Sequence, residues 1–279
     1  MGRYLCISVT FLDPYFHGSD DAGPEWPPSP LRLFQALFAG SRIGHYGRSW
    51  TDATEQAFRW LEKLRPPTII TPETVSLPGY TFFVPNNDSD KPGKQDRSTK
   101  IAHPHRLLDG DTIHYLWPLD GRSPEDDRHA GVICRQARNL MALGWGIDQV
   151  FGNGKVINDE EAKAFPGARF RPLEPPLVGT WRVPVSGTLD DLNKVFLSSR
   201  NRFQDGGFLP PLKPQRFGEV TYLSGKLLPP RRHAVFELPE GIAFRQKYTV
   251  MVAGMLRSLT IRQAQSDGRE FPGGIEAYV

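Results

Sequence analysis

The sequence predicts an α+β protein, and three observations support this prediction. Residues 4–12 are rich in β-forming side chains, and a proline-rich loop then leads into an amphipathic helix at residues 31–42. Further strand-like segments precede a third helix at residues 128–143, and a glycine-rich turn within residues 143–151 then leads into another strand. The resulting order is strand, helices, strand, strand, helix, strand, which is the βαββαβ order of a ferredoxin-like or RNA-recognition-type domain.

The first helix follows from the residues at its start. Ser29 is a suitable N-cap, and Pro30 suits the first helical position, where no amide hydrogen needs a partner. At 3.6 residues per turn one face of the helix carries Leu31, Leu33, Phe34, Leu37 and Phe38. A strand that enters a helix through such a loop can hold a phosphate at the helix N-terminus. A turn that prolines simply stiffen explains the same residues.

Two more helices are expected before residue 150. Asp52, with Glu55 three residues later, predicts a capped helix at residues 52–64, which ends before two prolines. The third helix is expected to bury Ile133, Ala137, Leu140 and Met141. Gly144 can end this helix in the left-handed conformation.

A long hairpin is expected between the second and third helices. Strand patterns occur at residues 68–70 and 81–84, and the polar stretch 85–109 precedes another strand at residues 111–118. We expect this last strand to return along the second, so that residues 82–117 form an extended arm. A polar insertion of this kind is often a solvated loop, and inside a compact domain it is often functional.

The remaining sequence predicts a second, smaller region. Residues 152–179 are rich in proline and glycine, and strand and helix patterns follow at residues 181–185, 188–200, 233–238 and 246–263. We expect a first domain at residues 1–170 and an incomplete second α+β region at residues 171–279.

Composition and motifs exclude several classes of protein. The net charge is 34 − 31 = +3, and the two cysteines lie inside apolar runs, as in reduced cytoplasmic proteins. The sequence contains neither an apolar run of about 18 residues nor a signal peptide pattern. His103, His105 and His114 are a weak metal pattern, and nucleotide-binding and hydrolase motifs are absent. We therefore expect no catalytic residue, no metal and no cofactor.

Basic and aromatic residues alternate late in the chain. Residues 194–232 contain eight lysines and arginines, against two acidic residues, with Phe203, Phe208, Phe217 and Tyr222 between them. Arginines bind phosphates and aromatic rings stack on unpaired bases, so this pattern favours single-stranded nucleic acid. A solvated basic face remains the alternative.

The run EWPPSPLRLFQAL at residues 25–37, directly after a strand, resembles the start of the Cas-five type of CRISPR-associated RAMP proteins. In that family a Pro-Pro-Ser loop leads into the first helix of a ferredoxin-like domain. Trp26, the pair Trp117-Pro118 and the segment Leu143-Gly144-Trp145-Gly146 resemble the fused subunit of type I-U (I-G) effectors in particular. That subunit joins a Cas-five-like half to a Cas-six-like half, and the resemblance covers nearly the whole chain.

The resemblance implies an RNA-binding subunit of a type I CRISPR surveillance (Cascade) complex, which serves antiviral defence. The first domain would bind and cap the 5′ handle of the CRISPR RNA. The arm at residues 82–117 would be a thumb against the adjacent backbone (Cas-seven-like) subunit. A large subunit is a further expected partner, target DNA is contacted only indirectly, and no membrane is involved.

The family's second half is a metal-independent endoribonuclease. Residues 233–238 and 248–262 match its opening, and we expect the rest of that half to be absent. The chain would then not cleave RNA by itself. The alternatives are a repeat-processing Cas-six-like endoribonuclease, in which a histidine activates the 2′-hydroxyl, and an unrelated protein with an RNA-recognition fold. From charge and position, the candidate RNA contacts are Arg32, Arg42, His45, Arg48, Arg97, Lys100, His103, His105, Arg106, Trp145, Lys155, Arg200, Arg202 and Arg216.

Overall fold

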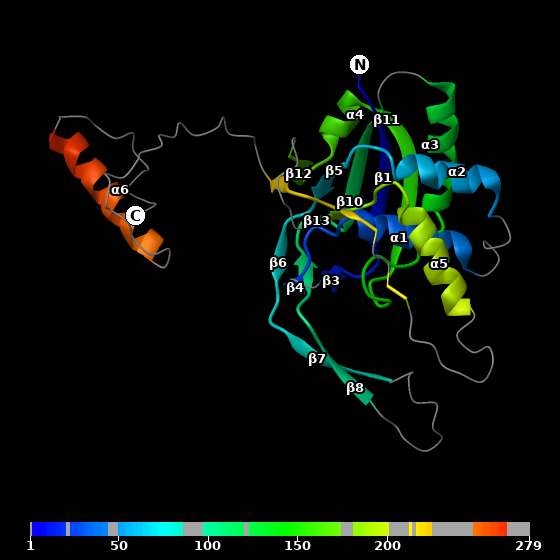
Figure 1. Cartoon of the computed structure of the whole chain (residues 1–279), viewed down its shortest axis with the longest axis horizontal. Helices are drawn as coiled ribbons and strands as arrows, with labels where there is room; N and C mark the ends of the chain where they lie inside the picture. The colour runs from blue at the N-terminus through cyan, green and yellow to red at the C-terminus, as the bar shows by residue number, and fades with distance from the viewer. Residues whose placement is uncertain are drawn as a thin grey trace. The chain divides into compact units, whose positions relative to one another are not determined.

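The computed structural model describes residues 2–20, 23–43, 50–85, 97–119, 123–173, 181–200, 212–213, 216–224 and 248–266 (Figure 1). The chain divides into two compact units, Met1–Leu227 and Leu228–Val279. The helices of the first unit are α1 (Pro30–Arg42), α2 (Asp52–Leu61), α3 (Pro124–Ala137), α4 (Asp159–Ala164) and α5 (Thr188–Arg200). The second unit contains α6 (Thr249–Ser266).

The strands all belong to the first unit among the residues described. They are β1 (Arg3–Phe11), β2 (Tyr15–Phe16), β3 (Ser19–Asp20), β4 (Gly23–Pro24), β5 (Thr68–Thr71), β6 (Thr74–Ser76), β7 (Tyr80–Pro85), β8 (Arg97–Ala102), β9 (His105–Leu107), β10 (Thr112–Leu119), β11 (Val150–Asn158), β12 (Ala168–Pro172), β13 (Trp181–Val183), β14 (Gly218–Val220) and β15 (Tyr222–Ser224). Mixed helices and antiparallel sheets confirm the α+β class.

A six-stranded sheet in the order β11-β1-β10-β5-β12-β15 forms the centre of the first unit. Every neighbouring pair in it is antiparallel. Ile7 of β1 lies opposite Tyr115 on one side and Gly154 on the other. The strands β1, β5, β10 and β11 therefore occupy adjacent positions, with β1 and β10 at their centre.

The two faces of this sheet bury different side chains. Leu5, Ile7 and Val9 point from β1 into the main core, which α1, α2 and α3 cover on one side of the sheet (Figure 1). Cys6 points to the opposite face and packs with Ala162 of α4 in a smaller apolar cluster. This alternation is the period of two expected for a strand with both faces covered.

The helix boundaries agree with the sequence for α1 and differ for α2 and α3. Ser29 caps α1, and its Oγ accepts a hydrogen bond from the amide of Arg32 at 3.3 Å. Thr51, rather than Asp52, caps α2. Ser123 caps α3, which consequently begins at Pro124 and ends at Ala137, six residues before the expected end.

The shorter α3 changes the surroundings of the residues that follow it. Met141, expected to be buried, lies beyond the helix and is 62% exposed. Gly144 has the expected left-handed backbone, with φ at +119°, but it belongs to a separate turn before β11.

The hairpin forms with a different return strand from the one expected. β7 pairs with β8, so that Tyr80 lies opposite Ala102 and Phe82 opposite Lys100. This two-stranded ribbon projects from the body of the first unit (Figure 1). The strand expected to return, β10, instead lies in the centre of the main sheet, because its alternate residues Ile113 and Tyr115 are fully buried.

The first unit extends past residue 170. β12 pairs with both β5 and β15, and Leu189 and Leu192 of α5 belong to the main core. The first unit therefore includes β12, β15 and α5, and its boundary lies at Leu227. A second RAMP-like domain remains a prediction, and its expected strand at residues 233–238 lies outside the described residues.

The second unit is described only through residues 248–266. Several apolar side chains of α6 are exposed, among them Met255 at 59% and Leu259 at 60%. No helix in the described part of the chain is both long enough and apolar enough to cross a membrane.

Candidate nucleic-acid interface

Three distant segments meet at the root of the β7–β8 ribbon. His17 lies in the loop after β2, Asp148 in the turn before β11, and Tyr80 at the start of β7. The Nδ1 atom of His17 is 2.5 Å from Oδ1 of Asp148, and its Nε2 atom is 2.5 Å from the hydroxyl of Tyr80. His17 is 8% exposed and Asp148 2% exposed, so both polar groups are buried and paired.

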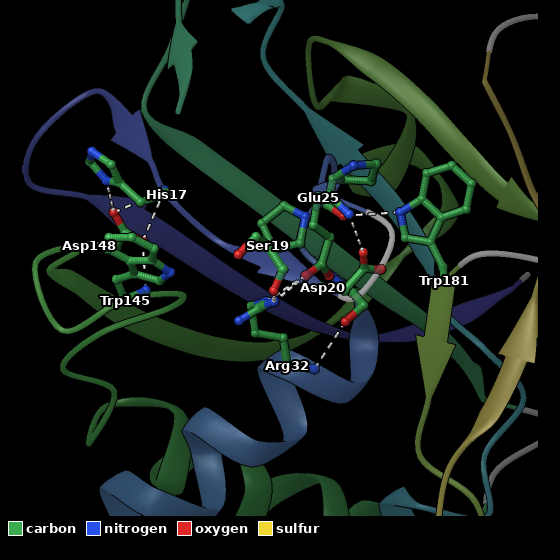
Figure 2. Close-up of polar contacts among 12 residues, drawn as sticks. His17, Ser19, Asp20, Glu25, Arg32, Trp145, Asp148 and Trp181 are labelled. Carbon is green, nitrogen blue, oxygen red and sulfur yellow. Dashed lines mark hydrogen bonds and ion pairs between the residues drawn. The ribbon is translucent and has the colours of Figure 1, made fainter. Parts of the chain in front are cut away.

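The buried carboxylate of Asp148 also closes the glycine-rich turn. It accepts hydrogen bonds from the backbone amides of Trp145 at 2.8 Å and of His17 at 3.1 Å (Figure 2). A Cβ atom on Gly144 would lie 2.3 Å from Oδ2 of Asp148 and 2.8 Å from the ring of Phe16. The turn therefore requires glycine at this position for both its backbone angle and its space.

Aromatic rings surround His17. Trp145 stacks on its imidazole with ring centres 6.1 Å apart. The ring centre of Phe82 lies 5.7 Å from that of Trp145 and 4.7 Å from that of Tyr80. Tyr80 is 42% exposed, and Trp145 and Phe82 are partly exposed. Burial, followed by the charge of Asp148, raises the pKa of Tyr80, so the phenol keeps its proton.

Basic side chains lie next to these rings. Lys100 is exposed and lies directly opposite Phe82 in the ribbon, which places both side chains on the same ribbon face. The imidazole of His103 covers Gly79, where a Cβ atom would be 2.3 Å from the ring. We name the group His17, Tyr80, Phe82, Lys100, Trp145 and Asp148 the hairpin-root site.

Two other residues predicted to contact RNA, His105 and Arg106, lie on β9, which follows β8 in the chain. The ring of His105 is 5.5 Å from that of Trp26, and burial lowers the pKa of His105. Arg106 is exposed and pairs in register with Tyr15 of β2. Both residues lie on a strand that connects the ribbon to the body of the unit.

Arg32 belongs to a different network. Its Nε atom donates to Oε2 of Glu25 at 2.8 Å, and Nη2 donates to the same carboxylate and to the carbonyl of Ser19 (Figure 2). Glu25 also accepts from the amide of Ser29, so an internal carboxylate lies at the N-terminus of α1. At this end of the helix, where the sequence allowed a bound phosphate, Glu25 takes the place that an external anion would use.

Arg42 is enclosed by aromatic rings at the other end of α1. Its guanidinium lies 3.8 Å from the ring centre of Trp50 and 5.3 Å from that of Phe196, and Nη2 donates to Asn193 at 2.6 Å. Burial lowers the pKa of Arg42. These contacts join α1 to α5, and a structural role accounts for this arginine.

The other predicted contacts are scattered. Lys155 lies on β11, on the sheet face that carries Cys6, and pairs with Glu161 at 3.0 Å. Arg216 is exposed, and its amide donates to Asp191 at 3.0 Å. Arg97 begins β8 and Arg200 ends α5, but their side chains are outside the description, as are residues 45, 48 and 202 entirely.

The three histidines of the weak metal pattern have separate surroundings. His114 stacks on Phe165 at 3.9 Å, and its Nδ1 atom is 2.8 Å from Oγ of Ser8 in the central sheet. His103 and His105 lie at the ribbon and on β9. Within the described ranges, no cluster of three or more histidine, cysteine, aspartate or glutamate side chains could hold a metal ion.

Sequence reasoning missed the polar centre of the hairpin-root site. Asp148 follows Gly146 by two residues, and an aspartate at such a position commonly accepts hydrogen bonds from the backbone amides of the turn. This pattern in the sequence could have identified Asp148. No local signal joins Asp148 to His17, because 131 residues separate them.

Comparison with known proteins gives the family. The crystal structure of a CRISPR protein from Archaeoglobus fulgidus is similar over 57% of this chain and 65% of its own chain, with 12% identity and a TM-score of 0.30. Among curated proteins no significant match is found. The profile of the CRISPR-associated protein GSU0054 family matches residues 6–270. This match spans nearly the whole chain, and the chain therefore belongs to the GSU0054 family of CRISPR-associated proteins.

Proposed function

We propose that the chain is an RNA-binding subunit of a type I CRISPR surveillance complex, equivalent to the Cas-five-like half of the fused type I-U (I-G) subunit. It would bind and cap the 5′ handle of the CRISPR RNA. The β7–β8 ribbon would be the thumb that contacts the adjacent backbone subunit. Membership of a CRISPR-associated family supports this role.

The arrangement of the central strands supports a ferredoxin-like first domain. In chain order the strands of the βαββαβ segment are β1, β5, β10 and β11, and in space they lie as β11-β1-β10-β5. A ferredoxin-like or RAMP domain is built from this βαββαβ segment.

The hairpin-root site is the single observation that carries the proposal. Trp145, Phe82 and Tyr80 provide partly exposed rings on which unpaired bases can stack. Lys100 lies on the same ribbon face and can neutralise a phosphate of the same strand. Aromatic rings beside a cation are the usual elements of a single-strand binding site.

Binding to labelled RNA tests the proposal. RNA with the 5′ handle and scrambled RNA of equal length would be titrated across a salt series, with and without the backbone subunit. We expect selectivity for the handle. Trp145→Ala should weaken binding by roughly 5- to 150-fold, the value of one base stacking contact. Lys100→Glu should weaken binding of both RNAs and reduce the salt slope by about 1.

A matched variant controls for net charge. Lys63 is exposed at the end of α2 and is not part of the hairpin-root site, so Lys63→Glu should leave the affinity nearly unchanged. Equal losses for the two charge reversals, or equal weak binding to handle and scrambled RNA, would contradict the proposal. Site-specific, metal-independent cleavage of the RNA would favour the endoribonuclease alternative.

A further inference from the structure

We infer that Tyr80 offers its phenolic oxygen as a hydrogen-bond acceptor, so that the hairpin-root site selects nucleobases that carry an amino group. The inference rests on the proposed function, because it names the chemistry of the base that this site would hold. It follows from the hydrogen bonds on both sides of the His17 ring.

Asp148 determines which nitrogen of His17 carries the proton. A carboxylate only accepts hydrogen bonds, and Asp148 already accepts them from the backbone amides of Trp145 and His17. The Nδ1 atom of His17, 2.5 Å from Oδ1, must therefore donate. The neutral imidazole consequently has its proton on Nδ1 and a lone pair on Nε2.

The lone pair on Nε2 in turn determines the direction of the Tyr80 hydroxyl. Because Nε2 of the neutral imidazole can only accept, the phenol donates its single proton along the 2.5 Å contact. The remaining lone pair of the phenolic oxygen is free to accept a hydrogen bond from a ligand. Tyr80 is 42% exposed, so a ligand can reach it.

The neighbouring rings would place a base beside this oxygen. Phe82 contacts both Tyr80 and Trp145, so a base stacked on this aromatic group has its edge near the phenol. Cytosine, adenine and guanine each carry an amino group that can donate to Tyr80, whereas uracil presents a carbonyl oxygen at the equivalent position. Two acceptors cannot pair, and the site should therefore disfavour uracil.

Two homopolymers of equal size test this directly. The full chain would be titrated with labelled RNA octamers of cytidine and of uridine at pH 7.5. We expect the cytidine octamer to bind roughly fivefold more tightly, which is the value of one net hydrogen bond. Tyr80→Phe should abolish the preference and leave the stacking contribution in place. Tyr15→Phe is the matched control and should retain the preference, because that ring lies 6.5 Å from His17 in a tilted contact.

A second pair of probes changes the ligand and not the protein. Octamers of adenosine and of purine riboside differ by the amino group on the base, and the wild-type chain should bind the adenosine octamer more tightly. This comparison remains decisive if Tyr80→Phe does not fold.

The outcomes separate the two proposals. Equal affinity for the cytidine and uridine octamers, or a preference that persists in Tyr80→Phe, would overturn the inference about Tyr80. The proposed function would stay intact in that case if RNA binding still depends on Trp145. If the wild-type chain binds neither the octamers nor the handle RNA, both proposals are overturned.

Discussion

The carboxylate of Glu25 accepts a hydrogen bond from Nε of Arg32 at 2.8 Å, across the loop that enters α1. Glu25 is 8% exposed and also accepts from the amide of Ser29. The positive end of α1 is thus neutralised from within the chain. This contact holds the proline loop on the helix.

Glu25→Ala should therefore destabilise the fold. It leaves Arg32 without its carboxylate and an amide of the helix start without an acceptor, so we expect a loss of about 2–4 kcal/mol in the free energy of unfolding. Urea unfolding of the variant and the wild-type chain measures this loss in the free energy of unfolding. Glu55→Ala is the control, because its pair with Arg59 is about one-third exposed and should contribute at most about 1 kcal/mol. Equal losses in both variants would refute this account.

Glu62 should prove essential for the docking of α5. Its side chain is 3% exposed, and its two oxygens accept from the amides of Gly187 at 3.0 Å and Leu189 at 2.8 Å. Removing it leaves one buried and one partly buried amide without an acceptor, and Glu62→Ala should cost about 2–4 kcal/mol. Hydrogen exchange should show faster opening of α5 amides than of β1 amides. Glu160→Ala, at an exposed position in α4, should leave both rates unchanged.

The two glycines beside Trp145 should respond differently to alanine. Gly144 has φ at +119°, and a Cβ atom there would be 2.3 Å from Asp148, whereas a Cβ atom on Gly146 meets nothing within 4 Å. Gly144→Ala should lower the free energy of unfolding by about 1–3 kcal/mol, and Gly146→Ala should change it by less than about 0.5 kcal/mol. Unfolding curves of the pair test the strain at this turn, and similar midpoints would exclude it.

His114 should make the stability depend on pH. Burial lowers its pKa from 6.5 to about 4, and the charges of Lys155 and Arg169 add to the effect. The unfolded chain then binds this proton at a higher pH than the folded chain. The free energy of unfolding should therefore fall as the pH decreases from about 6.5 to about 4.

A variant isolates this contribution. His114→Gln removes the titrating group, so its free energy of unfolding should fall less steeply between pH 6.5 and 4.5 than that of the wild-type chain. Urea unfolding at several pH values measures both slopes. Identical slopes would show that other groups cause the pH dependence.

Local patterns were sufficient for some elements but not for all, and not for their partners. Residues 152–179, expected to be a connection, contain most of β11 together with α4 and β12, because their proline and glycine content conceals these short elements. The N-cap Ser29, with Pro30 after it, predicts the start of α1 correctly, since both act within one turn. β10 was recognised as a strand but assigned to the hairpin, because its alternating side chains fit a ribbon and a central strand equally well. Only the packing of Ile113 and Tyr115 in the core excludes the ribbon.

The same distinction applies to the hairpin-root site. Residue type and position indicate Trp145 and Lys100 as RNA contacts, and the structure brings them near one another through Phe82. Arg42 was chosen on the same grounds, and it is enclosed by rings from three segments. Charge in a sequence does not reveal whether a guanidinium already has partners.

The sequence by itself determined the α+β class, the first helix with its cap, the glycine turn before β11 and the existence of a polar hairpin. These depend on interactions within a few residues, where propensity and periodicity act. The tertiary structure decided the return strand of the hairpin, the pairing of Glu25 with Arg32 and the alignment of Asp148, His17 and Tyr80. Those depend on contacts between residues far apart in the chain, and such contacts exist only after the core has brought the segments together.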